Sequence, residues 1–452
     1  MIPLGIETAG SPVLRRAITM RYAVALYMSS VLGSGILILP GLAAQKAGPA
    51  SLIAWAALSL VSYPLAYTFA SLSSRKPESG GVYAFAKESF GARWGDAVGW
   101  LFVVWYVFGA PAVTLIAASY LAFAFPVSRV AVYAAASAII IVAFIVNYRG
   151  IVVSGRVQLA VVASILALLV ATVLASAPRV NVSNFSPFLP NGIIPVGIAA
   201  ALIFWSYLGY ENVSNVAGEF KDPQRDFHRS IVLSVVLIAI LYFSVALATV
   251  GTNAYNAGGS VAPFAAMLSN VLGVYGAVGT ALLAVFIIFG TVNAYTTGMS
   301  RVIYASARDG GLPKLLAVID TKTGVPHRAL AALSVIGLIM QALYYFLNVD
   351  LTTALLIPSG SAIIVYVIGS GSGIRLLKQS GYKRFLPWIS LIASLIMLPF
   401  VGPLLIISGV ILLFGLSYRA VFRREEHSRP VGKSDSMEIQ LFPKCPREQS
   451  SY

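Results

Sequence analysis

Apolar residues dominate the chain in long stretches that are separated by short polar segments. A helix needs about 20 apolar residues to cross a bilayer, and the stretches approach or exceed that length. The pattern therefore predicts an all-α polytopic membrane protein. The twelve predicted transmembrane helices are residues 22–45, 50–73, 94–124, 129–147, 156–176, 192–218, 230–251, 271–304, 329–347, 351–373, 384–400 and 402–421.

The first predicted span contains an interruption. Two glycines flank a serine at Gly33-Ser34-Gly35, and Leu39-Pro40 follows in the same span. Glycine weakens a regular helix, and backbone groups that come free inside a membrane must be buried against protein or line a cavity. The stretch is therefore a candidate binding site. The alternative is a packing face, because small residues also let helices approach closely.

The sixth span is interrupted in a similar way, over residues 204–212. Within it, Glu211 is the only acidic residue in the middle of any predicted span. A carboxyl at membrane depth is costly, so Glu211 is a candidate for gating or for proton transfer. The alternative is a structural glutamate that ties two helices together.

Spans one and six lie five spans apart, so their helices start on opposite faces of the membrane. This spacing predicts two five-helix halves in an inverted repeat (5+5), with a site where broken helices 1 and 6 meet. The predicted division is a cytoplasmic tail over 1–17, a ten-helix core over 18–375 with halves of about 18–176 and 192–375, helices 11 and 12 over 376–421, and a disordered cytoplasmic tail over 422–452.

Composition and charge support this class. Of 452 residues, 58% are hydrophobic and 10% are charged, which is more apolar surface than a soluble fold buries. If the N-terminus is cytoplasmic, every Lys and Arg except Lys46, Arg129 and Arg179 falls on the cytoplasmic side. The distribution of the positive charges therefore indicates a multi-pass cell-membrane protein with both termini in the cytoplasm. The net charge of +15 follows from this topology, and we expect no nucleic-acid partner. Cys445 is the only cysteine, so no disulfide forms within the chain.

Four sequence blocks occur in a characteristic order: Gly33-Ser34-Gly35-Ile36 with Leu39-Pro40, then residues 77–84 (PESGGVYA), 219–226 (EFKDPQRD) and 300–310 (SRVIYASARDG). With them the chain resembles the amino acid–polyamine–organocation transporter superfamily, most closely its bacterial and archaeal amino acid permeases. The resemblance implies the leucine-transporter fold and a secondary active transporter that moves an amino acid by alternating access.

In such a fold the two breaks supply the substrate site. The amides that begin the second half of helix 1 face the cavity and suit a carboxylate. The resemblance implies that carbonyls near Val31, Trp205 and Leu208 accept from the substrate ammonium, and that nearby side chains select the substrate. The predicted substrate-binding residues are Val31, Gly33, Ser34, Gly35, Ile36, Tyr106, Ala110, Trp205, Leu208 and Tyr295.

Two residues bear on substrate class. Ala110 falls where the related arginine–agmatine antiporter has an asparagine that helps to hold the guanidinium, which favours a neutral or apolar amino acid here. Glu211 matches the gating glutamate of that antiporter, beside the same tryptophan pattern, and keeps a cationic amino acid or polyamine exchanger as the alternative. A non-transporting receptor with the same fold is a further alternative.

The sequence leaves the coupling ion open. Sodium would require carbonyls of helix 1 together with hydroxyls of Thr296, Thr297 and Ser300. Two other routes do not need a sodium site. They are proton coupling through Glu211 and exchange of substrates without an ion. We expect no cofactor and no metal, and the partners expected are an amino acid and the lipid bilayer, with the oligomeric state open.

A membrane enzyme is not expected. Its catalytic cluster would have to lie within the spans, yet His228, His327 and His427 all fall in predicted cytoplasmic segments, without metal-ligand spacing.

Overall fold

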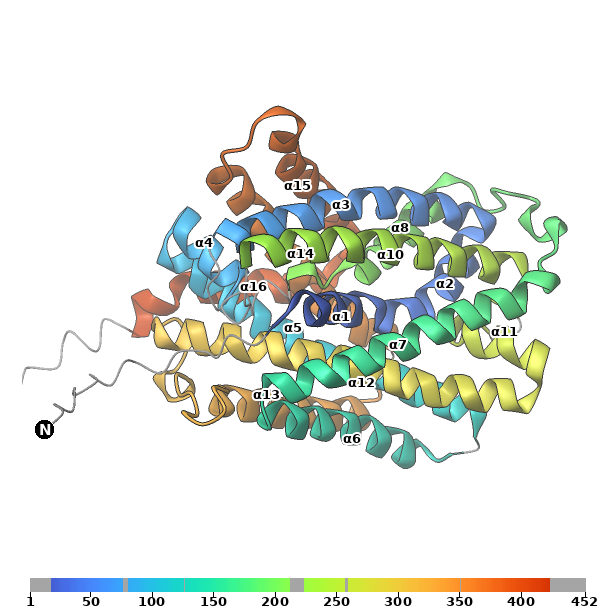
Figure 1. Cartoon of the computed structure of the whole chain (residues 1–452), viewed down its shortest axis with the longest axis horizontal. Coiled ribbons are helices and arrows are strands. Elements are labelled where there is room, and N and C mark those ends of the chain that lie inside the picture. The colour runs from blue at the N-terminus through green and yellow to red at the C-terminus, as the bar shows by residue number, and fades with distance from the viewer. Residues whose placement is uncertain are drawn as a thin grey trace, which may run out of the picture.

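The computed structural model describes residues 18–75, 80–125, 127–211, 223–256, 259–349 and 351–422. Long helices lie side by side along the longest axis of the molecule (Figure 1). The predictions for the tails 1–17 and 423–452, and for residues 77–79 and 219–222 of two sequence blocks, fall outside the described residues. The helices are α1 Met20–Leu32, α2 Ser34–Ala47, α3 Ser51–Arg75, α4 Val82–Phe90, α5 Ala92–Ala124, α6 Arg129–Tyr148, α7 Ile151–Ser176, α8 Ile193–Phe204, α10 Pro223–Gly251, α11 Pro263–Leu272, α12 Val274–Arg308, α13 His327–Phe346, α14 Leu351–Leu376, α15 Leu386–Met397 and α16 Leu405–Phe422.

Among the described residues, nine helical stretches are long and apolar enough to cross a membrane. One of them, Ser34–Arg75, joins α2 to α3, and another, Gly381–Val421, contains both α15 and α16. The predicted sixth span corresponds to the shorter apolar helix Ile193–Tyr207. The structure therefore supports a multi-pass membrane protein, while twelve spans and the inverted repeat remain predictions. The sequence pattern did not predict α11.

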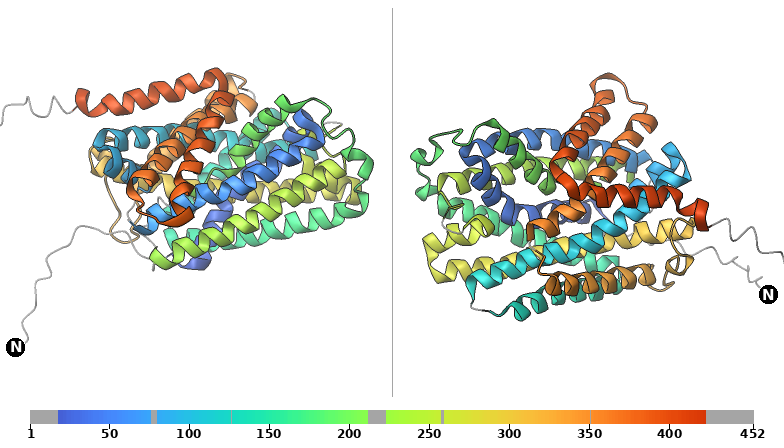
Figure 2. Two further views of the ribbon diagram at one scale, coloured as in Figure 1. Left: turned by 90° about the horizontal axis from the view of Figure 1, so that it is seen from above. Right: turned by 180° about the vertical axis from the view of Figure 1, so that it is seen from behind.

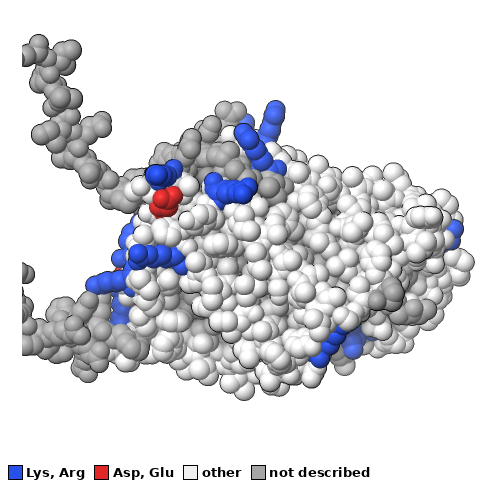
Figure 3. Space-filling view, turned by 90° about the horizontal axis from the view of Figure 1, so that it is seen from below, with Lys and Arg blue, Asp and Glu red and all other residues white. Residues whose placement is uncertain are grey.

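Helix α5 lies at the centre of the bundle. Of its apolar window 89% is buried, against 28% for Arg129–Tyr148 and 11% for Gly381–Val421. Helices α12, α14 and α16 pack along α5, and α10 packs along α3. In Figure 2, α15 stands out from one side of the bundle. The peripheral helices thus carry the apolar surface that a bilayer would cover, and much of the surface in Figure 3 carries no charge.

Both interruptions are present. Helix α1 ends at Leu32 and α2 begins at Ser34, so Gly33 alone separates them. Helix α8 ends at Phe204 and passes through the single 3₁₀ turn η4, Trp205–Tyr207, to an extended Leu208. The breaks meet in space, because α2 packs against both α8 and η4.

At one end of the bundle, Asp309 fastens α4 to the last turn of α12. Lys87 and Tyr83 on α4 both donate to Asp309 Oδ2, the tyrosine at 3.2 Å, and Arg308 donates to Oδ1 at 3.2 Å. Partial burial acts to raise the pKa of Asp309, but the hydrogen bonds and charges of Lys87 and Arg308 outweigh it and lower the pKa below its ordinary value. This end therefore holds together best when Asp309 is ionised.

Candidate functional site

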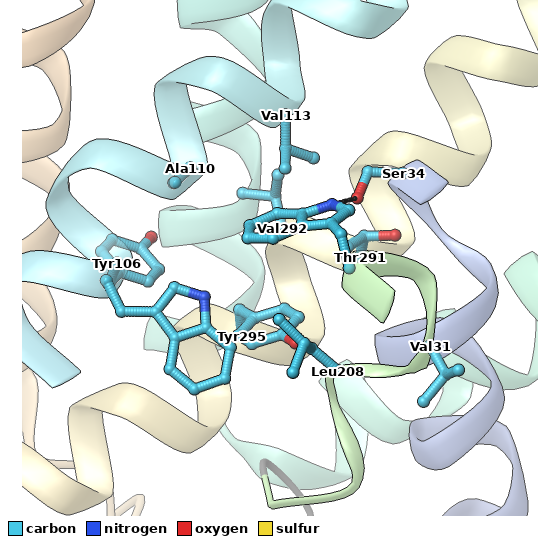
Figure 4. Close-up of a pocket in the computed structure, with 12 residues that line it drawn as sticks. Val31, Ser34, Tyr106, Ala110, Val113, Leu208, Thr291, Val292 and Tyr295 are labelled. Carbon is cyan, nitrogen blue, oxygen red and sulfur yellow. Dashed lines mark hydrogen bonds between the residues drawn. The ribbon is translucent and has the colours of Figure 1, made fainter. Parts of the chain in front are cut away.

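A cavity of about 30 Å³ lies between the two breaks, α5 and α12. Tyr106 and Ala110 approach from one side and Val31 and Ser34 from the other (Figure 4). This volume matches about one water molecule, so an amino acid would require the walls to move apart. The lining residues are Val31, Ser34, Trp105, Tyr106, Gly109, Ala110, Val113, Trp205, Leu208, Thr291, Val292 and Tyr295.

Most of the predicted substrate residues meet in this cavity. They are Val31, Ser34, Tyr106, Ala110, Trp205, Leu208 and Tyr295. The sequence analysis missed Trp105, Gly109, Val113, Thr291 and Val292. Helical spacing could have found several of these, because Gly109 and Val113 lie three or four residues from predicted positions on α5, and Thr291 lies four before Tyr295 on α12.

Gly33 and Gly35, by contrast, are packed against neighbouring helices. A Cβ atom on Gly33 would lie 1.2 Å from Thr291 Oγ1, and one on Gly35 would lie 2.1 Å from Ser206 Oγ. Neither glycine lines the cavity, nor does Ile36, whose side chain is fully buried. For the position of these side chains, the packing interpretation is the better description.

The backbone at the start of α2 still suits an anion. The first amides of a helix have no partner within it, and no side chain caps α2. The Trp205 indole donates to Ser34 Oγ at 3.3 Å, which brings a polar group of the second break to the start of α2. Ser34 therefore marks the polar end of an otherwise largely apolar cavity.

Glu211 is fully buried beside the second break but does not line the cavity. Its Oε2 accepts from Gly209 N at 2.9 Å and from the Tyr366 hydroxyl of α14. That hydroxyl in turn accepts from Gly209 N at 2.9 Å and from Tyr210 N at 3.2 Å. Glu211 and Tyr366 thus join the second break to α14. Tyr366 could not be predicted, because it lies 155 residues away along the chain.

Comparison with known proteins gives the family of this chain. The family model described as amino acid permease matches residues 18–422, nearly the whole described chain. The chain belongs to the amino acid permease family. The expectation of a transporter rather than an enzyme is thereby confirmed.

Relatives of this permease carry related names. It is 32% identical to an amino acid permease named YecA of Bacillus subtilis, over 90% of this chain and 96% of that protein. It is 28% identical to the L-methionine/branched-chain amino acid exporter YjeH of Escherichia coli, over 86% and 92%. It is 29% identical to the branched-chain amino acid permease BcaP of B. subtilis, over 71% and 73%. The family implies an amino acid as the substrate, and the names of these relatives include both permeases and an exporter.

The residues predicted for sodium are each hydrogen-bonded to other groups of the protein. Thr296 shares a hydrogen bond of 2.6 Å with the Tyr106 hydroxyl, and the Thr297 hydroxyl lies 2.5 Å from Asn147 Oδ1. The buried Arg301 guanidinium donates to Ser300 Oγ at 2.9 Å and to the Thr297 carbonyl at 3.0 Å. A buried guanidinium therefore already donates to Ser300 Oγ, one of the hydroxyls predicted for sodium.

A second cavity of about 290 Å³ adjoins the first, and Trp205 and Leu208 line both. It opens among α2, α8, α14 and the α15–α16 region, and Lys46 is the one charged residue among the described residues that line it. Its other lining residues are Ile38, Leu39, Leu42, Ile198, Leu202, Phe204, Val261, Leu351, Leu355, Leu356, Ser359, Ile363, Met397, Phe400 and Val401. Such a volume approaches that of small-molecule pockets, and because the two cavities share lining residues, a ligand could reach the first cavity from the second.

Proposed function

We propose that this permease moves a neutral, apolar amino acid across the cell membrane by alternating access. The observation that carries the proposal is the lining of the small cavity, whose described residues include no charged side chain and present Gly109, Ala110 and Val113 opposite the start of α2. An α-carboxylate would lie at the α2 amides, and an aliphatic side chain would point towards α5. The names of the relatives, which mention methionine and branched-chain amino acids, agree with this class.

We further propose twelve spans in the 5+5 arrangement, with both termini and the Asp309 end of the bundle in the cytoplasm. The second cavity, at the Lys46 end, is then the extracellular approach to the site, and Trp205 separates the two cavities. In this proposal transport is independent of sodium, because the Arg301 guanidinium already donates to Ser300 Oγ, one of the hydroxyls that sodium would require. Proton binding by Glu211 or exchange of one amino acid for another drives the cycle.

Binding is tested by thermal stabilisation of the purified protein with leucine, isoleucine, valine and methionine, against arginine, lysine and putrescine. We expect the neutral set to stabilise and the cationic set to have little effect. A preference for arginine or putrescine would overturn the substrate class. Ala110→Asn should raise arginine binding relative to leucine about fivefold, the worth of about one added hydrogen bond, whereas Ala110→Val should not.

Transport is tested by uptake into proteoliposomes with and without unlabelled amino acid inside. Accumulation or counterflow of leucine would support a transporter. Binding without any flux would support the receptor alternative instead.

A further inference from the structure

The second cavity combines one cation with an apolar interior. Lys46 lies in the last turn of α2, and its side chain is exposed. Its ammonium forms no ion pair with any carboxylate of the described residues. The cavity therefore presents a single positive charge at its rim, which attracts an anionic group.

The rest of the lining offers few hydrogen-bonding groups. Ser359 is the one hydroxyl residue among the described residues of the lining, and it donates to the Leu355 carbonyl of its own helix at 2.7 Å. The Trp205 indole already donates to Ser34 Oγ. An amino acid fits such a space poorly, because its ammonium would lose water beside Lys46 without gaining a carboxylate. An apolar chain fits it well, because an apolar cavity holds water weakly.

Part of the cavity wall faces outward from the bundle. Phe400 is 45% exposed and belongs to η9, Leu398–Leu404, which packs against α8 and α14. Ile198 on α8 is 41% exposed. In the proposed topology Lys46 lies at the outer end of α2, so an amphiphile in the outer half of the bilayer meets this wall with its head group at the level of Lys46.

The size of the cavity limits the ligand to a single short chain. Its volume of about 290 Å³ matches the liquid volume of about ten water molecules. A methylene group takes about as much space as one water molecule, so a carboxylate with about eight carbons fills the cavity. A phospholipid with two acyl chains is too large.

We propose that the second cavity binds a linear medium-chain carboxylate, with the carboxylate at Lys46 and the alkyl chain against Trp205 and Leu208. These two residues line both cavities, so the bound chain closes the route by which the amino acid reaches the small cavity. The carboxylate is then an inhibitor of transport from the outer face. Only this inhibition rests on the proposed function, and the binding does not.

Binding is measured by calorimetry on the full-length protein in lipid nanodiscs, with empty nanodiscs as the blank. The probes are the linear carboxylates from hexanoate to dodecanoate, together with octanol and octylamine. We expect saturable binding that tightens about fourfold per methylene group up to octanoate, the effect of burying one CH₂, and that levels off by about ten carbons. Octanol should bind about fivefold more weakly than octanoate, because the ion pair with an exposed lysine is partly screened.

Two variants of Lys46 test the position of the carboxylate. Lys46→Gln should weaken octanoate about fivefold and leave octanol unchanged, and Lys46→Glu should reverse the preference, so that octylamine binds more tightly than octanoate. Arg179→Gln is the matched control, since Arg179 is an exposed cation of η2, Ala177–Arg179, that lines neither cavity. All probes should keep their affinities in this control.

Binding that does not saturate, or that is the same in Lys46→Glu as in the wild type, would overturn the inference, because it would indicate partition into lipid. Leucine uptake into proteoliposomes is then measured with octanoate outside. Saturable octanoate binding without inhibition of uptake would overturn the closing of the route. Absence of any leucine binding or uptake by the wild-type protein would overturn the proposed function and leave the carboxylate site standing.

Discussion

Gly35 lies so close to Ser206 that a Cβ atom on the glycine would be 2.8 Å from the serine Cα and 2.1 Å from its Oγ. This contact brings the start of α2 against η4, and so holds the uncapped first amides of α2 beside the second break. Such an approach is possible only without a side chain.

We therefore predict that Gly35→Ala already abolishes leucine binding, because η4 must move away from α2. The thermal midpoint should fall as well, consistent with about 1–3 kcal/mol of overpacking. Gly279→Ala in α12 is the control: outside its own stretch of helix, no heavy atom of a described residue lies within 4 Å of the added methyl group, so stability should stay or rise slightly. Thermal unfolding with and without leucine measures both the leucine binding and the thermal midpoint of each variant. Normal leucine stabilisation in Gly35→Ala would show that this contact does not shape the site.

The second prediction concerns Glu211. Glu211→Gln keeps the size of the side chain and can still accept from Gly209 N and the Tyr366 hydroxyl, but it cannot ionise. We expect leucine affinity to stay within about threefold, while transport slows at least about tenfold and loses its dependence on pH.

Tyr366→Phe is the matched variant for Glu211, since it removes a partner of the carboxyl and keeps the carboxyl itself. Its transport should remain dependent on pH. Exchange rates are measured in proteoliposomes from about pH 5 to about pH 8. A glutamine variant with the wild-type rate and pH profile would leave Glu211 with only a structural role.

The third prediction concerns the coupling ion. Because Arg301 donates to Ser300 Oγ and the Thr297 carbonyl, replacing sodium by choline should change neither leucine affinity nor transport. Arg301→Lys should lower stability by about 2–3 kcal/mol, since a lysine cannot reproduce the fixed geometry of a buried guanidinium. The measurements are leucine binding in each salt and thermal unfolding of the variant. Leucine uptake that requires sodium would contradict the assignment.

The fourth prediction concerns Asp309 and pH. Its pKa is lower in the folded protein than in the unfolded chain, so its contribution is present above the ordinary Asp value of about 3.9 and is lost as the pH falls below it. Asp309→Asn should destabilise the protein at pH 7 by about 0.5–1 kcal/mol, a modest amount because Lys87 is partly exposed. Thermal unfolding from pH 7 downwards should show the gap between variant and wild type closing as the pH falls. A gap that is constant with pH would mean that the Asp309 charge adds no stability.

The sequence by itself determined the class of the protein and the location of both breaks. Long apolar runs in a chain with few charges have to lie in a membrane as helices, since only there are their backbone groups satisfied and their side chains solvated. The position of the first break followed from glycine alone, and the structure has it at Gly33. The family resemblance, and not periodicity, pointed to Tyr106, Ala110 and Tyr295, and all three line the small cavity.

The tertiary structure decided which partners these groups meet. Gly35 faces Ser206 instead of the cavity, and Arg301 lies among the oxygens that had been assigned to sodium. Tyr242 reaches Val31 across 211 residues of chain. A local pattern states which side of a helix is apolar, but it holds no information about which distant helix packs there. Only the packed bundle brings a phenol of α10 to a carbonyl of α1, because that contact depends on the placement of every helix between them.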